Sequence, residues 1–187
     1  MKYCNQCASP VTLQVPPGDN LPRYVCANCG AIHYQNPKNV IGCIAEWQDK
    51  ILLCKRAIEP RLGLWTLPAG FMENGETTAQ TAARETLEEA RGTVTNLALY
   101  GVFSLPHINQ VYIMYRGDLQ DGKAAVGAES SAVALLTEQS IPWDELAFPV
   151  ITETLRLYFK DRQAGRYPVH VGDIIRGPDQ QIRIIHY

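Results

Sequence analysis

Runs of apolar residues, interrupted by turn-forming residues, divide the middle of the chain into short segments. Residues 39–47 and 50–57 predict two β-strands joined by a short turn at Gln48-Asp49. Later runs are rich in β-branched and aromatic residues, which favour strands. The other predicted strands are residues 65–70, 97–105, 110–119 and 132–137. This pattern predicts that a β-sheet forms the centre of the protein.

Two segments follow a helical period instead. Residues 75–90 predict the clearest helix, and Thr77-x-x-Gln80 matches a capping box that places its start near Thr77. At about 100° per residue, one side of this helix is mainly apolar and the other is acidic. The apolar side holds Ala79, Ala83, Thr86, Leu87 and Ala90, and the acidic side holds Glu85, Glu88 and Glu89. We expect the apolar side to pack on the sheet and the glutamates to face outward. A second helix is predicted over residues 148–163.

The chain changes character at two points. Residues 1–35 are rich in turns and cysteines and show no helical period, which predicts a small domain of short strands and loops. Residues 36–163 hold the remaining predicted strands and both helices, which predicts an α/β or α+β sandwich. Residues 164–187 form a C-terminal extension, in which residues 169–175 and 181–187 are compatible with a β-hairpin.

Composition and charge narrow the function classes. The 187 residues are 46% hydrophobic, enough for one sizeable core and a small appendage. A net charge of -2 gives no sign of a general nucleic-acid or membrane partner, although a bound cation would still permit an anionic substrate. No apolar run approaches the roughly 18 residues of a membrane span, and the first ten residues lack the apolar centre of a signal peptide. We therefore expect a cytoplasmic protein.

Four of the six cysteines form two pairs with metal-ligand spacing. The pairs are Cys4-x2-Cys7 and, eighteen residues later, Cys26-x2-Cys29. Two such knuckles supply the four thiolates of a tetrahedral Zn²⁺ site, which is structural because all four positions are filled. Two disulfides or an iron site are the alternatives, and both are less common in a cytoplasmic chain. Basic and aromatic residues beside the knuckles are compatible with nucleic-acid binding, but such residues more often cover a small metal core.

The three clustered glutamates require an explanation. Like charges three and four residues apart repel and weaken a helix. A solvated charged face is the ordinary interpretation, but no lysine lies close by, and a glycine-bounded loop, GFMENG, precedes the helix. Three carboxylates on one face suit Mg²⁺ or Mn²⁺, whose charge would offset the repulsion.

The stretch from Gly70 to Gly92 resembles the Nudix box, G-x5-E-x7-R-E-U-x-E-E-x-G-U, where U is aliphatic. Six charged or glycine positions fall in register: Gly70, Glu76, Arg84, Glu85, Glu88 and Glu89. Three positions depart from the pattern: Thr86 and Gly92 replace aliphatic residues, and Arg91 replaces glycine. We expect the glycine, shifted by one residue, still to end the helix.

The resemblance implies a Nudix-type α/β/α sandwich with a mixed sheet, preceded by a small zinc-ribbon β domain. It also implies divalent-metal-dependent hydrolysis of a nucleoside diphosphate linked to another group. The implied metal ligands are Glu85, Glu88, Glu89 and the carbonyl of Ala69 or Gly70. Arg84 would orient the cluster, paired with Glu76 or Glu85. The general base would be Glu85, Glu88 or a residue of a later loop, for which Glu129 is the candidate; an ordinary exposed glutamate is the alternative.

A zinc ribbon ahead of a Nudix domain occurs in two branches of the family. The chain lacks the S-Q-P-W-P-F-P run of the NADH pyrophosphatases and is more similar to ADP-ribose and FAD pyrophosphatases, also in IPWDELAFP (residues 141–149). This resemblance implies cleavage of such a substrate to two monophosphates. Four aromatic residues are candidates for stacking on adenine, with a core position as the alternative: Trp65, Phe71, Phe103 and Tyr112.

Other functions stay open. Within the enzyme class, NADH or a capped RNA end is an alternative substrate. In another class, the protein would sense a nucleotide without turnover while the zinc ribbon contacts nucleic acid or protein. The resemblance also implies a homodimer, and a small-molecule nucleotide rather than nucleic acid as the partner.

Overall fold

The computed structural model describes residues 1–179 and 181–187 of the chain, which divides into two compact units, Met1–Pro37 and Lys38–Tyr187. In the first unit, β1 (Val11–Gln14), β2 (Arg23–Cys26) and β3 (Ile32–His33) form an antiparallel sheet in the order β1-β2-β3. Of the four paired cysteines, Cys26 ends β2, and Cys4, Cys7 and Cys29 lie in the turns and loops beside this sheet.

The second unit is built on one mixed sheet. Its strands are β4 (Lys38–Trp47), β5 (Lys50–Arg56), β6 (Trp65–Thr66), β7 (Ala69–Phe71), β8 (Val94–Leu105), β9 (Gln110–Leu119), β10 (Ser130–Leu136), β11 (His170–Arg176) and β12 (Ile182–His186). Among the described residues the main order is β10-β5-β4-β9-β8-β11-β12, with β6 beside β5 and β7 beside β4. The β4–β9 and β8–β11 pairs are parallel, and the other pairs are antiparallel.

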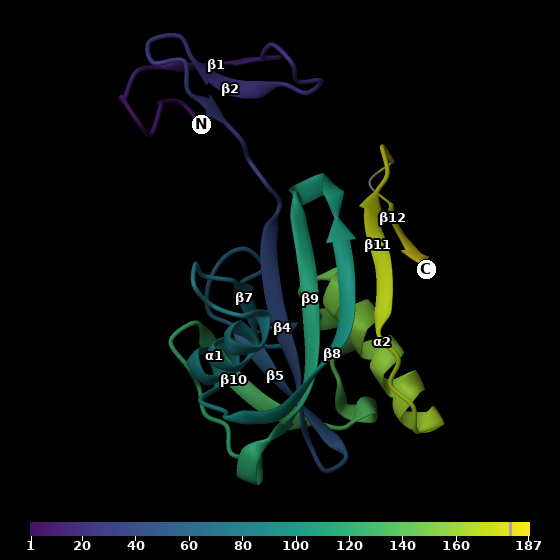
Figure 1. The fold of residues 1–187 in the computed structure, drawn as a ribbon. Helices are drawn as coiled ribbons and strands as arrows, with labels where there is room; N and C mark the ends of the chain where they lie inside the picture. Colours follow the sequence, from purple (N-terminus) through teal and green to yellow (C-terminus); the bar gives the residue numbers. More distant parts are fainter. Residues whose placement is uncertain (180) are drawn as a thin grey trace. The chain divides into compact units, whose positions relative to one another are not determined.

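The two α-helices of the described chain cover opposite faces of this sheet, as Figure 1 shows. On one face, α1 (Thr78–Ala90) packs on an apolar cluster that includes Ile41, Leu52 and Leu119. On the other, α2 (Pro149–Ala164) packs on a larger cluster that includes Tyr100 and Phe103. The predicted α/β/α sandwich with a mixed sheet is confirmed.

Helix α1 begins as predicted but turns a different face to the sheet. Thr77 is the N-cap, and both hydrogen bonds of the capping box with Gln80 are present. The expectation that Leu87 packs inward and the three glutamates face outward is wrong for Leu87 and for two of the glutamates. Glu85 and Glu89 are buried, at 8% and 6% exposure, while Leu87 is 49% exposed. The buried face consists of Thr81, Ala82, Glu85, Thr86, Glu89 and Ala90.

The end of α1 also differs from expectation. Arg91, not the following glycine, is the C-cap in the left-handed region, with φ 52° and ψ 20°. Gly92 has another role, because a Cβ there would lie 2.8 Å from Leu119 Cδ1. Thr86 fits the position of an aliphatic residue because its hydroxyl donates to the carbonyl of Ala82 at 2.8 Å.

The C-terminal strands extend the sheet beyond β8. β11 pairs with β8 in parallel and with β12 antiparallel. Asp161 of α2 anchors this region, because it accepts hydrogen bonds from the hydroxyl of Tyr100 at 2.8 Å and contacts Nε2 of His170 at 2.6 Å. None of the helices in the described residues combines the length and apolar character that crossing a membrane requires.

Candidate active site

Arg84 joins the carboxylates of the box. Its Nε atom donates to Glu76 Oε1 at 2.6 Å, and its Nη1 atom donates to Glu85 Oε1 at 2.7 Å and to Glu88 Oε2 at 2.9 Å. Its Nη2 atom also donates to the carbonyl of Phe71 at 3.1 Å. The hydrogen bond from Arg84 lowers the pKa of Glu76 to about 2. The expected pairing of Arg84 with Glu76 and Glu85 is therefore present, and it ties the loop before α1 to the helix.

Glu85 lies directly against β7. A Cβ at Gly70 would overlap the Glu85 carboxylate sterically, so any larger residue there would displace this side chain. Gly70 pairs with Ile41 across the β4–β7 ladder, which places it on the face of the sheet that α1 covers. Burial raises the pKa of Glu85, and the hydrogen bond from Arg84 opposes that rise.

Glu89 is the most buried carboxylate of the cluster. Its Oε2 atom accepts a hydrogen bond from the backbone N–H of Ala69 at 3.3 Å. Burial raises the pKa of Glu89 to about 8, with the nearby charge of Glu85 adding to the effect. A buried carboxylate with one weak hydrogen bond is costly to ionise unless a cation approaches it.

A later loop brings Glu129 to the same place. Gly127 donates its N–H to the carbonyl of Glu89 at 3.0 Å, and a Cβ on Gly127 would overlap the carbonyl of Glu88. Glycine thus permits this loop to pack on the end of α1. The exposed Glu129 contributes to the raised pKa of both Glu85 and Glu89, so its charge lies near theirs.

Three of the four aromatic candidates lie in one row across the sheet. The row runs Phe71, Val40, Tyr112, Phe103. Exposure falls along this row, from 49% at Phe71 to 7% at Tyr112 and 0% at Phe103. The assignment of Phe103 and Tyr112 to substrate stacking is wrong, because both rings are enclosed in the core beneath α2. The ring of Phe71 stays accessible, with Lys38 Nζ 4.8 Å from its ring centroid.

Trp65 is partly buried at the margin of the same core. Its ring centroid lies 5.7 Å from Lys55 Nζ.

Arg56, the last residue of β5, was not among the residues predicted from the sequence. Its positive charge opposes the rise in the pKa of Glu89. The available signal was the basic pair Lys55-Arg56, which follows the apolar run of residues 51–54 at the end of β5.

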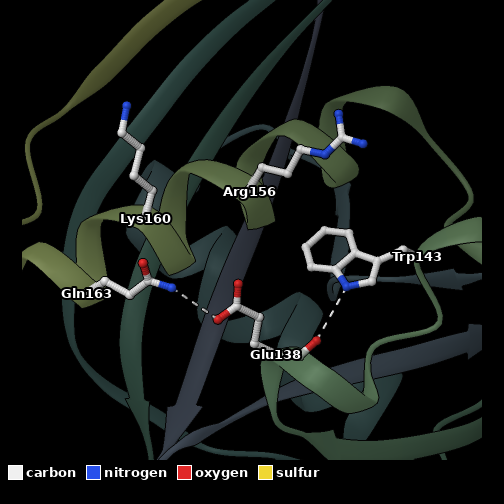
Figure 2. Close-up of a pocket in the computed structure, with 5 residues that line it drawn as sticks. All are labelled: Glu138, Trp143, Arg156, Lys160 and Gln163. Atoms are coloured by element: carbon white, nitrogen blue, oxygen red, sulfur yellow. Dashed lines mark hydrogen bonds between the residues drawn. The ribbon is translucent and has the colours of Figure 1, made fainter.

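Two surface hollows lie apart from the carboxylates. Figure 2 shows the first, about 260 Å³, where Glu138 contacts Gln163 and Trp143. Its lining residues are Glu138, Trp143, Arg156, Lys160 and Gln163. The second, about 420 Å³, is lined by Arg61, Leu146, Ala147, Pro149, Thr152, Glu153, Arg156, Ile182 and Ile184. Neither set includes a residue of the box.

The four paired cysteines converge in the first unit. Their Sγ atoms lie within 4.8 Å of one another, with Cys4 and Cys29 at 3.6 Å and Cys7 and Cys26 at 3.5 Å. A tetrahedron with Zn–S bonds of about 2.3 Å has sulfur–sulfur edges of about 3.8 Å, so the cluster fits zinc. His33 Nε2 lies 3.3 Å from Cys4 Sγ, as a neighbour of the cluster and not a fifth ligand.

The fold and the carboxylate helix are those of a Nudix-type hydrolase, and the comparisons agree. The family model described as the NUDIX domain matches residues 36–158, and the model described as the Nudix N-terminal zinc ribbon matches residues 2–35. The chain belongs to the Nudix hydrolase family.

A crystal structure of a NUDIX hydrolase from Nitrosomonas europaea is 55% identical, with a TM-score of 0.90, and the match covers 94% of this chain and 99% of that one. Among curated relatives, an ADP-ribose pyrophosphatase of Methanocaldococcus jannaschii is 31% identical over 62% of this chain and 69% of its own length. An NAD-capped RNA hydrolase of Vibrio vulnificus is 35% identical over 54% of this chain, but only 37% of that relative is covered.

Proposed function

We propose that this protein hydrolyses a nucleoside diphosphate linked to another group, of the ADP-ribose or FAD type, to two monophosphates. The observation that carries the proposal is the packing of Glu85 and Glu89 against the backbone of β7, where burial raises the pKa of both carboxylates. Such a site is stabilised in its ionised form by a bound cation.

The residues present fit a divalent metal. Glu85, Glu88 and Glu89 supply hard oxygen donors, which suit Mg²⁺ or Mn²⁺, with the carbonyl of Ala69 or Gly70 as a further donor. When bound, such an ion neutralises diphosphate charge and lowers the pKa of a water molecule. Cys4, Cys7, Cys26 and Cys29 would hold a structural Zn²⁺.

The chain's own groups then position and activate the reactants. Arg84 keeps Glu85 and Glu88 in place through its hydrogen bonds. Glu129, exposed on the loop beside α1, is a candidate to accept the proton of the attacking water, and Glu85 or Glu88 is the alternative. The exposed ring of Phe71 offers a stacking surface for a base.

The choice of substrate rests on the relatives. The Methanocaldococcus jannaschii relative is named an ADP-ribose pyrophosphatase, which supports the first substrate class. The NAD-capped RNA hydrolases support NADH or an NAD-capped RNA end as a second class. We also propose a zinc-ribbon domain at residues 1–35, a hydrolase domain at residues 36–163 and a C-terminal extension at residues 164–187.

We further propose that the protein is a cytoplasmic homodimer. Light scattering of the full chain tests the assembly.

The test is a substrate screen with Mg²⁺ and with Mn²⁺. It follows release of AMP, FMN, NMNH and ribose 5-phosphate from ADP-ribose, FAD and NADH, and release of NMN from NAD-capped RNA, which leaves a 5′-monophosphate RNA. Glu89→Gln should lower turnover by more than about 100-fold, beyond the usual cost of losing a group that only supports a metal ligand. Glu145→Gln, at an exposed position in the turn before α2, should have no effect. Metal binding without turnover of any substrate would favour the nucleotide-sensing alternative.

A further inference from the structure

His33 is buried against the cysteine cluster of the first unit. Its side chain is 8% exposed, and its Nε2 atom lies 3.3 Å from the Sγ atom of Cys4. Within residues 1–179 and 181–187, the imidazole ring has no other hydrogen-bond partner. Buried polar groups are nearly always hydrogen-bonded, so the contact with sulfur is what allows this ring to be buried.

The strand β3 carries His33 to this position. His33 is the partner of Tyr24 in the β2–β3 ladder, and Cys26 lies two residues beyond Tyr24 on β2. Side chains two residues apart on a strand lie on the same face, so His33 and Cys26 share a face of the small sheet. The backbone closes the turn between them, because Cys26 donates its N–H to the carbonyl of Ala31 at 2.9 Å. A residue that follows the second cysteine pair therefore contacts a cysteine of the first pair.

The sulfur that His33 contacts has little access to water. Cys4 is 3% exposed, whereas Cys29, whose sulfur lies 3.6 Å away, is exposed. A buried charge is costly unless it is hydrogen-bonded. The backbone N–H of Gln6 donates to Cys4 Sγ at 3.4 Å. Cys4 thus has one donor from its own turn, and His33 supplies a second from a different strand.

The chemistry of a metal-bound cysteine fixes the direction of this hydrogen bond. The thiolate is the form that binds metal, and it has no proton to donate. The Nε2 atom of His33 therefore carries the proton and donates to the sulfur, as one nitrogen of a neutral imidazole can. The four sulfur atoms lie within 4.8 Å of one another and complete a tetrahedron, so His33 is not required as a ligand.

We propose that His33 is a positioning residue of the zinc site, which donates an N–H···S hydrogen bond to Cys4 and thereby slows the release of zinc. The inference goes beyond the proposed hydrolysis and rests only on the zinc assignment. Four thiolates around one Zn²⁺ leave an excess of negative charge, and a donor to the charged form stabilises it. Losing a group that hydrogen-bonds to a metal ligand typically costs about 10- to 100-fold in metal affinity.

The test compares two variants of the full chain. His33→Phe fills the space without a donor, and His33→Gln keeps an N–H donor. His107→Gln, at an exposed position between β8 and β9, is the control. Once the zinc content has been measured, zinc transfer to a chromogenic chelator should be about 10- to 100-fold faster for His33→Phe than for the wild type. His33→Gln should recover most of this difference, and His107→Gln should match the wild type.

Cobalt substitution supplies a readout that a change in packing alone does not move. The d–d bands of tetrahedral Co²⁺ report the set of ligands, and the sulfur-to-cobalt charge-transfer bands report the charge on the sulfur. The d–d bands of His33→Phe should equal those of the wild type, which shows that the four-sulfur site still forms. The charge-transfer bands should move to lower energy in His33→Phe, because the sulfur has lost a hydrogen bond, and should return in His33→Gln.

Three results would overturn this role of His33. The first is zinc release from His33→Phe at the rate of the wild type, and the second is release from His33→Gln as fast as from His33→Phe. The third is a change in the d–d bands, which would make His33 a ligand. A wild type without zinc would overturn the zinc assignment and this role together. A wild type that holds zinc but cleaves no nucleotide would overturn only the proposed hydrolysis.

Discussion

The Nε atom of Arg84 lies 2.6 Å from Oε1 of Glu76, across the turn that joins the glycine-containing loop to α1. The same guanidinium group reaches Glu85, Glu88 and the carbonyl of Phe71. Part of the answer to the crowding of three glutamates is therefore inside the protein. Arg84 offsets the repulsion between Glu85 and Glu88. Glu89 makes no hydrogen bond to Arg84; burial favours its protonated form, and a bound cation would favour its ionised form.

Replacing Arg84 by lysine should disrupt this arrangement. An ammonium group cannot donate to four acceptors in fixed directions as the guanidinium does. We expect kcat/KM to fall by about 10- to 100-fold, the scale found when partners that orient metal ligands are lost. The unfolding temperature should drop by about 2–4 °C, as expected when the free energy of unfolding falls by about 1 kcal/mol. Arg156→Lys, at an exposed site on α2, is the control; equal effects of the two changes would contradict the role of Arg84.

Gly70→Ala should damage the site more than the fold. The added methyl group would occupy the space of the Glu85 carboxylate, which can swing away because it ends a flexible side chain. We expect at least tenfold weaker Mn²⁺ binding, measured by calorimetry, with little change in unfolding temperature. Gly117→Ala makes the opposite comparison, since its Cβ would lie 2.9 Å from the carbonyl of Thr95 within the β8–β9 ladder. That variant should lose stability while keeping metal affinity, and a reversed pattern would refute this explanation.

The metal-free protein should lose stability as the pH rises from about 5 to 8. Burial raises the pKa of Glu89 to about 8 in the folded state, against about 4.3 for an unfolded glutamate. Between these values the folded state keeps a proton that the unfolded state has released, so the free energy of unfolding falls with rising pH. The stability that protonated Glu89 contributes is fully present below about pH 4 and is lost above about pH 8.

Thermal unfolding of chelator-treated wild type and Glu89→Gln at several pH values checks this dependence. Glutamine carries no charge, so the variant should be more stable than the wild type at pH 8, and the difference should shrink by pH 5. Adding Mn²⁺ at pH 8 should restore the unfolding temperature of the wild type. Parallel curves for the two proteins would show that Glu89 does not titrate in this range.

The six thiols should fall into two kinetic classes. Burial raises the pKa of Cys43 and of Cys54 to about 12, so both stay neutral and unreactive at pH 8. With a chelator present, a colorimetric thiol reagent should label four cysteines quickly and the other two only after denaturation. Without the chelator, zinc should protect the four paired cysteines as well. Equal reaction of all six, or no response to the chelator, would contradict the zinc assignment.

Arg91→Gly should stabilise the protein. Arg91 ends α1 in the left-handed region, where a residue with a Cβ is strained and glycine is not. The expected gain is about 0.5–1 kcal/mol, or roughly 1–4 °C in unfolding temperature, with kcat unchanged. Arg91→Ala removes the same charge but keeps the Cβ and should give no gain. If alanine stabilises as much as glycine, charge and not backbone strain is responsible.

Local patterns along the chain predicted the start of α1, the cysteine cluster and several strands. The capping box placed the start of α1 at Thr77, because both of its hydrogen bonds form within four residues. The spacing of Cys4, Cys7, Cys26 and Cys29 predicted a cluster that the structure contains, since each pair needs only a tight turn. Strands β4 and β5 were likewise predicted, because burial on both faces leaves long apolar runs. The predicted strand over residues 65–70 is instead two short strands, β6 and β7, which pair with β5 and β4.

The orientation of α1 required the tertiary structure. A helical period gives the angles between side chains but does not say which side meets the sheet. The apolar count favoured Leu87 inward, yet Gly70 and Gly127 let β7 and the Glu129 loop approach closely, and this approach buries Glu85 and Glu89. The environments of Phe103 and Arg56 also required the tertiary structure. Whether an aromatic ring or a cation at the end of a strand faces the core or the site depends on segments distant in sequence, whose packing no local pattern records.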